Sequence, residues 1–399
     1  MVAIPSSKKQ TPIKCNLKLT IALLLVSVAS IPLFAIKHLQ LDKDNVLHLE
    51  HSEHINTRHS IRAAAADNDI QQQPNNIKQV SCPKYLSDTS IYNPNTELTR
   101  DETKRLTITE PKFYISLHSQ FYDKMRYVHI MKQGDYYERG LTSLFHDILS
   151  SYDTTTTKSK EERPLMLDIG MNIGWFTLYS RAHGHDVAAF EPNPTMFLRV
   201  CESLEYNNWD SDNTIELWNY GLGTTPGKFN LTTGNNPGGS SFHEERLAKK
   251  FRKKMEVEVV TLDSIVLQQG YLQRHISLMK VDVEGFENYV FEGGRALLYN
   301  NNIDNIIMEN SIQNGTIVGG MFDMLYDAGY RVKEIRTVNG DPYHEDWWST
   351  FNPVLEERHS AYIANSKQQV VKPLEEESDQ IKFLSKATSN IWWVHKRFI

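Results

Sequence analysis

Acidic or amide side chains stand at the carboxyl ends of five short apolar runs along this chain. These residues are Asp168, Glu191, Asn219, Asp282 and Glu309. Each run has the length and composition of a buried strand, and acids or amides are seldom buried there without partners. Packing alone therefore explains the pattern poorly. Such groups could accept hydrogen bonds from a ligand, bind a cation or take up a proton.

The first of these ends opens a glycine turn. The segment Leu165 to Leu178, LMLDIGMNIGWFTL, has the pattern of a strand, a turn and a helix start. Gly170 and Gly174 let the backbone approach a ligand closely. A dinucleotide fingerprint would need glycine where Asn172 stands, and an ionised Asp168 would repel a pyrophosphate. The turn therefore disfavours a nicotinamide oxidoreductase and favours S-adenosylmethionine, which has a sulfonium, an ammonium and no phosphate.

Glu191 adds a second element of this cofactor site. It ends the next strand-like run, about twenty residues further on, where a carboxylate accepts hydrogen bonds from a ribose diol. The expected cofactor-binding residues are Asp168, Gly170, Asn172, Gly174, Glu191 and Asn219.

The elements around these residues alternate between strand-like and helical patterns. This alternation predicts an α/β fold, with a parallel sheet, helices on both faces and ligands beyond the carboxyl ends of the strands. A helix is predicted over Tyr137 to Leu149, and the basic run Arg246 to Met255 reads as a solvated helix. YRVKEIRTV and NIWWVHKRF are two further strand candidates, the second with one buried tryptophan and one at an edge. Trp347 and Trp348 lie in a loop between them and are expected to contact the acceptor.

Four motifs occur in order along the chain: LDIGMNIGWFTL, AFEPNP, LDSI and MKVDVEGFENYVFEGG. Together they resemble the FkbM-like methyltransferases, a branch of the class I S-adenosylmethionine-dependent fold, over roughly Phe113 to Asn310. The resemblance implies a Rossmann-like, mainly parallel seven-stranded sheet. It also implies O-methylation of a hydroxyl, often on a sugar. A catalytically silent member that binds carbohydrate or acts as a scaffold is the alternative.

Methyl transfer to a sugar hydroxyl needs alignment and removal of a proton. Asp282 and Glu284 lie two residues apart and face one side if the strand stays regular, so one of their pKa values could rise toward neutrality. We expect Glu284 to be the base and Asp282 to lie nearer the cofactor, with the reverse assignment open. A glycine-rich loop could bring Ser240, Ser241 or His243 over the site as a lid, and His243 is a third catalytic candidate.

A divalent cation is a rival way to activate the hydroxyl. Asp282, Glu309 and Asn310 supply the oxygen ligands that hard cations prefer. No spacing in the sequence marks a metal site, so no metal ligand is assigned, and a divalent cation remains possible but not favoured.

A membrane anchor is predicted near the amino terminus. The eighteen residues from Leu19 to Ile36 carry no charge, and four lysines precede them. This pattern predicts a type II single-pass protein with residues 1–18 in the cytoplasm, 37–81 as a luminal stem and 82–399 as the methyltransferase domain, in the Golgi. A cleaved signal peptide, with small residues at Ser27 and Ala29, is the alternative.

The net charge restricts the possible binding partners, and the cysteines allow one disulfide. The formal net charge of −6 gives no basic footprint for nucleic acid, so the expected partners are a glycan or glycoconjugate acceptor and the membrane. A disulfide between Cys82 and Cys201 is allowed, and a buried free cysteine is equally compatible with the sequence. Asn230 and Asn314 stand in glycosylation sequons that a luminal domain could use.

Overall fold

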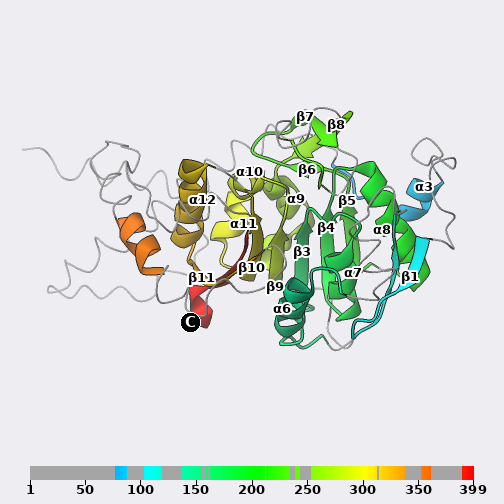
Figure 1. Cartoon of the computed structure of the whole chain (residues 1–399), viewed down its shortest axis with the longest axis horizontal. Coiled ribbons are helices and arrows are strands. Elements are labelled where there is room, and N and C mark those ends of the chain that lie inside the picture. Colours follow the sequence, from blue (N-terminus) through cyan, green and yellow to red (C-terminus); the bar gives the residue numbers. More distant parts are fainter. Residues whose placement is uncertain are drawn as a thin grey trace, which may run out of the picture. The chain divides into compact units, whose positions relative to one another are not determined.

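A seven-stranded sheet lies at the centre of the fold (Figure 1), in the strand order β11-β12-β10-β9-β3-β4-β5. The computed structural model describes residues 77–87, 103–118, 136–154, 159, 162–211, 213–233, 239–242, 253–311, 314–337, 352–360 and 389–399. The strands of the sheet are β3 (Leu165–Ile169), β4 (Asp186–Phe190), β5 (Ile215–Trp218), β9 (Ile276–Val281), β10 (Ile303–Asn310), β11 (Tyr330–Thr337) and β12 (Ser389–His395).

Six strands of this sheet run in the same direction, and β12 inserts antiparallel between β10 and β11. The predicted α/β fold with a mainly parallel seven-stranded sheet is therefore confirmed. In β12, Trp393 is fully buried and Trp392 only partly, as the pattern predicted.

Helices pack on both faces of the sheet, as expected. They are α6 (Arg139–Leu149), α7 (Trp175–Ala182), α8 (Pro194–Asn207), α9 (Leu262–Gln269), α10 (Glu287–Gly293), α11 (Arg295–Tyr299) and α12 (Gly315–Asp327), with 3₁₀ turns at Tyr271–Gln273 and Lys396–Phe398. Alternate strand residues enter two apolar cores: Leu167 and Ala188 pack in one, and Met166 and Val187 in the other. This two-residue period is what a sheet covered on both faces requires. The helix predicted from Tyr137 begins two residues later, at Arg139.

A three-stranded sheet with the order β6-β8-β7 stands beside the main one. Its strands are β6 (Gly221–Leu222), β7 (Gly227–Thr233) and β8 (Lys253–Val260). The helix predicted from Arg246 to Met255 is wrong at its end, because Lys253 to Met255 belong to β8. Val257 and Val259 point inward while Glu256 and Glu258 are exposed, and this alternation outweighs the helical propensity of the lysines.

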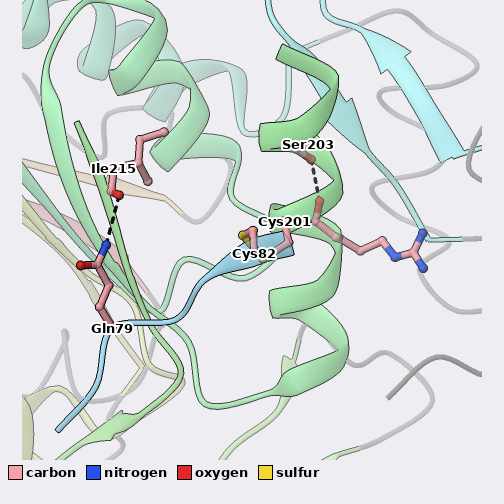
Figure 2. Close-up of a disulfide and its surroundings, with 6 residues drawn as sticks. Gln79, Cys82, Cys201, Ser203 and Ile215 are labelled. Carbon is pink, nitrogen blue, oxygen red and sulfur yellow. Dashed lines mark hydrogen bonds between the residues drawn. A yellow bond between two sulfur atoms is a disulfide. The ribbon is translucent and has the colours of Figure 1, made fainter. Parts of the chain in front are cut away.

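The segment before the sheet is tied to the free side of β5. The backbone N–H of Val80 donates to the carbonyl of Leu217 at 2.9 Å. Cys82, in the short helix α3 (Cys82–Leu86), forms a disulfide with Cys201 in α8 (Figure 2). A hairpin of β1 (Lys104–Leu106) and β2 (Tyr114–Ser116) packs on the same helix. Of the two states that the sequence left open for these cysteines, the structure shows the bonded one.

Several predicted features lie outside the described residues, namely the anchor 19–36, residues 1–18, the stem up to residue 76, His243, Trp347 and Trp348. Among the residues that are described, no helix combines the length and apolar character needed to cross a bilayer.

Removing the disulfide should destabilise the fold. The bond closes a loop with a sequence separation of 119 residues. Restricting so long a loop in the unfolded chain stabilises the folded state by roughly 2–5 kcal/mol. We expect a Cys82→Ser/Cys201→Ser variant to unfold at a clearly lower urea midpoint than the wild type, and dithiothreitol to lower the wild-type midpoint but not that of the variant. Equal midpoints would contradict a stabilising role.

Candidate active site

A cavity opens at the carboxyl ends of β3, β4, β9 and β10. Its empty space, including the open mouth, is about 800 Å³. Gly170, Asn172 and Glu191 line one part of it, and Asp282, Glu284 and Glu309 line another. These predicted residues therefore meet in one place. Asp168, Gly174 and Asn219 are not among the lining residues.

Asp168 is completely buried behind the cavity wall rather than on it. Its Oδ2 accepts a hydrogen bond from the Thr177 hydroxyl at 2.6 Å, and its Oδ1 lies 3.6 Å from Nζ of Lys280. Burial raises the pKa of Asp168, and the neighbouring Lys280 and Thr177 act to lower it. The structure thus gives Asp168 a supporting position, not the direct ligand contact that we expected.

Lys280 is a central group that was not predicted from the sequence. Its buried ammonium lies 3.2 Å from Oδ2 of Asp282 and donates to the carbonyl of Gly170 at 3.1 Å. Burial lowers the pKa of Lys280, but the carboxylates of Asp282 and Asp168 outweigh this and raise it above the usual value of a lysine. The ammonium therefore joins the glycine turn to the end of β9.

The glycine at position 170 is required by the backbone next to it. Gly170 has a φ of +79°, and a Cβ there would lie 1.8 Å from the carbonyl oxygen of Asp282. Its role is thus to let the turn pack against the end of β9. Gly174, also at positive φ, begins α7 and faces Val200 of α8, so it serves helix packing rather than the cavity wall.

Glu191 is held by backbone N–H groups at the other end of the cavity. Its Oε2 accepts from the N–H of Asn172 at 3.0 Å and its Oε1 from that of Asn193 at 2.9 Å. Burial raises the pKa of Glu191 to about 7, although both backbone hydrogen bonds lower it. The amide of Asn219 donates to the Glu191 carbonyl at 2.7 Å. Asn219 therefore fixes the strand end that carries the carboxylate.

Three carboxylates gather at the second part of the cavity. Ligand oxygens of Asp282, Glu284 and Glu309 all lie within 4.8 Å of one another, a set that could bind a metal ion. Burial and the charges of Asp282 and Glu284 raise the pKa of Glu309 well above its ordinary value. Its buried Oε2 has no hydrogen-bond partner among the described residues. Asn310, the third member of the predicted metal set, is the last residue of β10 and is not among the residues that line the cavity.

A turn, not a regular strand, brings Glu284 into this group. The strand β9 ends at Val281, and Glu284 has a φ of +55° in the left-handed region. The premise of a continuous strand was therefore wrong, although both carboxylates do line the cavity. Non-glycine residues adopt this conformation only where surrounding contacts impose it.

Glu287 supplies one of these contacts. Its Oε1 accepts from the backbone N–H of Gly285 at 2.9 Å, and its other oxygen has no partner within the described part of the chain. Burial raises the pKa of Glu287 to about 7, and the charge of Asp282 adds to this.

Residues 239–242 reach the cavity from the side of the small sheet. The hydroxyl of Ser241 donates to the carbonyl of Glu284 at 2.9 Å, and the amide of Asn193 donates to the hydroxyl of Ser240 at 3.2 Å. The rings of Phe242 and Phe286 lie 4.9 Å apart and line the cavity. The loop expected to approach the site therefore does so with Ser240 and Ser241.

Other lining residues were not predicted from the sequence. Among them are Tyr137, Glu138, Tyr220, Phe242 and Phe286. They come from a helix start and from loops, where the apolar periodicity that marks strand ends is missing. For Lys280 a signal did exist, because a single lysine in the apolar run ISLMKV must find a carboxylate partner if it is buried.

Residues 168–332 match the methyltransferase FkbM domain family. The match runs from the glycine turn to the end part of the sheet and includes both parts of the cavity. This match agrees with the resemblance drawn from the four sequence motifs.

Two curated relatives align within the same region. "Methyltransferase sdnD" of Sordaria araneosa is 31% identical over 159 residues, which is 33% of this chain and 60% of that protein. "Methyltransferase 1" of Beauveria bassiana is 28% identical over 146 residues, which is 32% of this chain and 57% of that protein. The chain thus spans less than two thirds of the length of either relative.

Solved methyltransferases are similar at a lower level. The alignment with an S-adenosylmethionine-dependent methyltransferase from Agrobacterium tumefaciens spans 76% of this chain and 73% of that protein, with 8% identity and a TM-score of 0.34. The alignment with the StiE O-methyltransferase spans 80% of this chain and 92% of that protein, with 10% identity and a TM-score of 0.31. Likeness at this level carries no argument about function.

The buried Glu287 should make the stability of the protein depend on pH. Because the fold raises its pKa from 4.5 to about 7, it favours the protonated form. The resulting stability is fully present below the unfolded-state pKa and is lost as the pH rises through 7. We expect Glu287→Gln, which cannot ionise, to gain roughly 2 kcal/mol relative to wild type between pH 5 and pH 8, measured by urea unfolding. The exposed Glu258→Gln is the control, and pH-independent differences for Glu287→Gln would contradict the assignment.

Proposed function

We propose that this protein is an S-adenosylmethionine-dependent O-methyltransferase. The observation that carries the proposal is the single cavity in which the Glu191 end and the carboxylate group of Asp282, Glu284 and Glu309 meet. One end offers acceptors for the hydroxyls of a nucleoside, and the other offers groups that take up a proton. The match of residues 168–332 to the methyltransferase FkbM domain supports methyl transfer as the reaction.

The residues at the Glu191 end fit S-adenosylmethionine. Each oxygen of Glu191 accepts one backbone N–H and retains a lone pair for a ribose hydroxyl. The carboxylates along the wall favour a cationic ligand, and no phosphate site is needed. When bound, the cofactor supplies an electrophilic methyl group.

Glu284 remains the preferred base for the acceptor hydroxyl. Asp282 is the weaker candidate because its Oδ2 is ion-paired with Lys280. Glu309 is weaker too, because burial and the neighbouring carboxylates raise its pKa well above its ordinary value, which favours the protonated form. In its protonated form Glu309 would donate a hydrogen bond within the group of carboxylates, and Glu284 would accept the proton of the acceptor hydroxyl. Removing the proton raises the nucleophilicity of the hydroxyl at the moment of methyl transfer.

For the acceptor we propose a sugar hydroxyl of a glycan or glycoconjugate in the secretory pathway. Support comes from the apolar run Leu19 to Ile36, which would anchor the protein as a type II Golgi protein with a luminal catalytic domain. The disulfide between Cys82 and Cys201 is the kind that persists in oxidising compartments. Asn230 and Asn314 of the two sequons are exposed, as glycosylation would require.

The transfer reaction tests this proposal. Full-length protein is incubated with methyl-labelled S-adenosylmethionine and a panel of glycans and glycoproteins, with and without EDTA. We expect label on a glycan, a loss of roughly 100-fold or more in Glu284→Gln, and no effect of EDTA. The control is Glu258→Gln, an exposed residue on β8.

Each other outcome points elsewhere. Loss of transfer with EDTA would replace the carboxylate base by a divalent cation at the same three residues. Binding of S-adenosylhomocysteine without transfer to any hydroxyl would support the catalytically silent, carbohydrate-binding alternative.

Cofactor affinity should also depend on the protonation of Glu191. Its pKa of about 7 in the free protein means that it is partly protonated at neutral pH, whereas ribose hydroxyls donate best to the ionised form. We expect the affinity for S-adenosylhomocysteine to rise roughly tenfold from pH 6 to pH 8. In calorimetric titrations, Glu191→Gln should bind more weakly and lose this pH dependence. A wild-type affinity that is flat across this range would contradict the ribose contact.

A further inference from the structure

The charged groups on the cavity wall are all of one sign. Five carboxylate residues line the cavity, and no lysine, arginine or histidine does so in the part of the chain that the structure describes. The carboxylates are Glu138, Glu191, Asp282, Glu284 and Glu309. Glu138 stands just before α6, Glu284 stands in the turn after β9, and the other three stand at strand ends.

The buried cation nearest to these groups is turned to other partners. The side chain of Lys280 is 4% exposed, and its Nζ contacts Asp168, Asp282 and the carbonyl of Gly170. An anionic group in the cavity would therefore meet carboxylates without gaining this ammonium.

Aromatic rings form a second, independent feature of the same wall. Phe242 and Phe286 line the cavity beside Glu284, and Tyr289 packs behind Phe286 at a ring distance of 4.2 Å. The face of an aromatic ring is electron-rich, so it attracts C–H groups and cations and repels anions. An uncharged ring can stack here, and an amino group would be favoured further.

We propose that the acceptor site selects against anionic substrates. It takes an uncharged or amine-bearing sugar and excludes those that carry a carboxylate, sulfate or phosphate near the reacting hydroxyl. Glu138 is a specificity-determining residue, because it adds negative charge from outside the group of three carboxylates. The inference rests on the proposed function, since it assigns an acceptor class to the same cavity.

Binding of matched sugars tests this selection without requiring turnover. Full-length protein saturated with S-adenosylhomocysteine is titrated with methyl β-glucosaminide, methyl β-glucoside and methyl β-glucuronide, which differ in one charged group, and followed by saturation-transfer NMR. We expect the glucosaminide to bind best and the glucuronide at least tenfold more weakly than the glucoside. In Glu138→Gln this ratio should fall by at least threefold, while Glu258→Gln should leave it unchanged.

Three results would overturn the proposal. They are equal or tighter binding of the glucuronide, an unchanged ratio in Glu138→Gln, and no binding of either the glucoside or the glucosaminide. The expected ranking together with no methyl transfer to any glycan would instead uphold the charge selection and contradict the proposed reaction. Failure of the charge selection and failure of the proposed reaction therefore give different results.

Discussion

One buried ammonium group connects the parts of the candidate active site. Nζ of Lys280 lies between the carboxylates of Asp168 and Asp282 and donates to the carbonyl of Gly170. A charge so deeply buried is tolerated only with partners, and loss of one partner would leave an uncompensated charge. The end of β3, the glycine turn and the end of β9 are therefore coupled to one another. The cavity is built on that junction.

The two ends of the cavity are fixed by different means. Glu191 is oriented by backbone N–H groups and by the Asn219 amide on its own carbonyl, so its position follows from the strand ends. Glu284 depends on a turn with a left-handed residue, which Glu287 and Ser241 stabilise through the backbone. Strain of this kind at the reacting end has to be supported by surrounding contacts. A rigid binding end and a supported reacting end thus share one wall.

The general location of the site could be predicted from the sequence, because carboxyl ends of parallel strands meet at one edge of the sheet. This rule brings Glu191, Asp282 and Glu309 together from runs far apart in the chain. It does not tell which end residue faces the ligand, and so Asp168 was placed on the wall although it lies behind it. It is also silent on loops, which supply Glu138 and the two phenylalanines. In β8 a two-residue alternation was hidden beneath a lysine-rich composition.

The outer side of β5 is covered by the described segment that starts at Ile77. Ile77 is buried in one of the two cores, and the backbone of Val80 hydrogen-bonds to Leu217 on that strand. An uncovered edge strand is a template for pairing with other chains. Cleavage on the carboxyl side of Val80 would therefore expose unpaired backbone groups of β5 and favour aggregation. Every residue that lines the cavity would still be present. Cleavage before Ile77 would leave a fragment in which the segment around Val80 still covers the edge of β5.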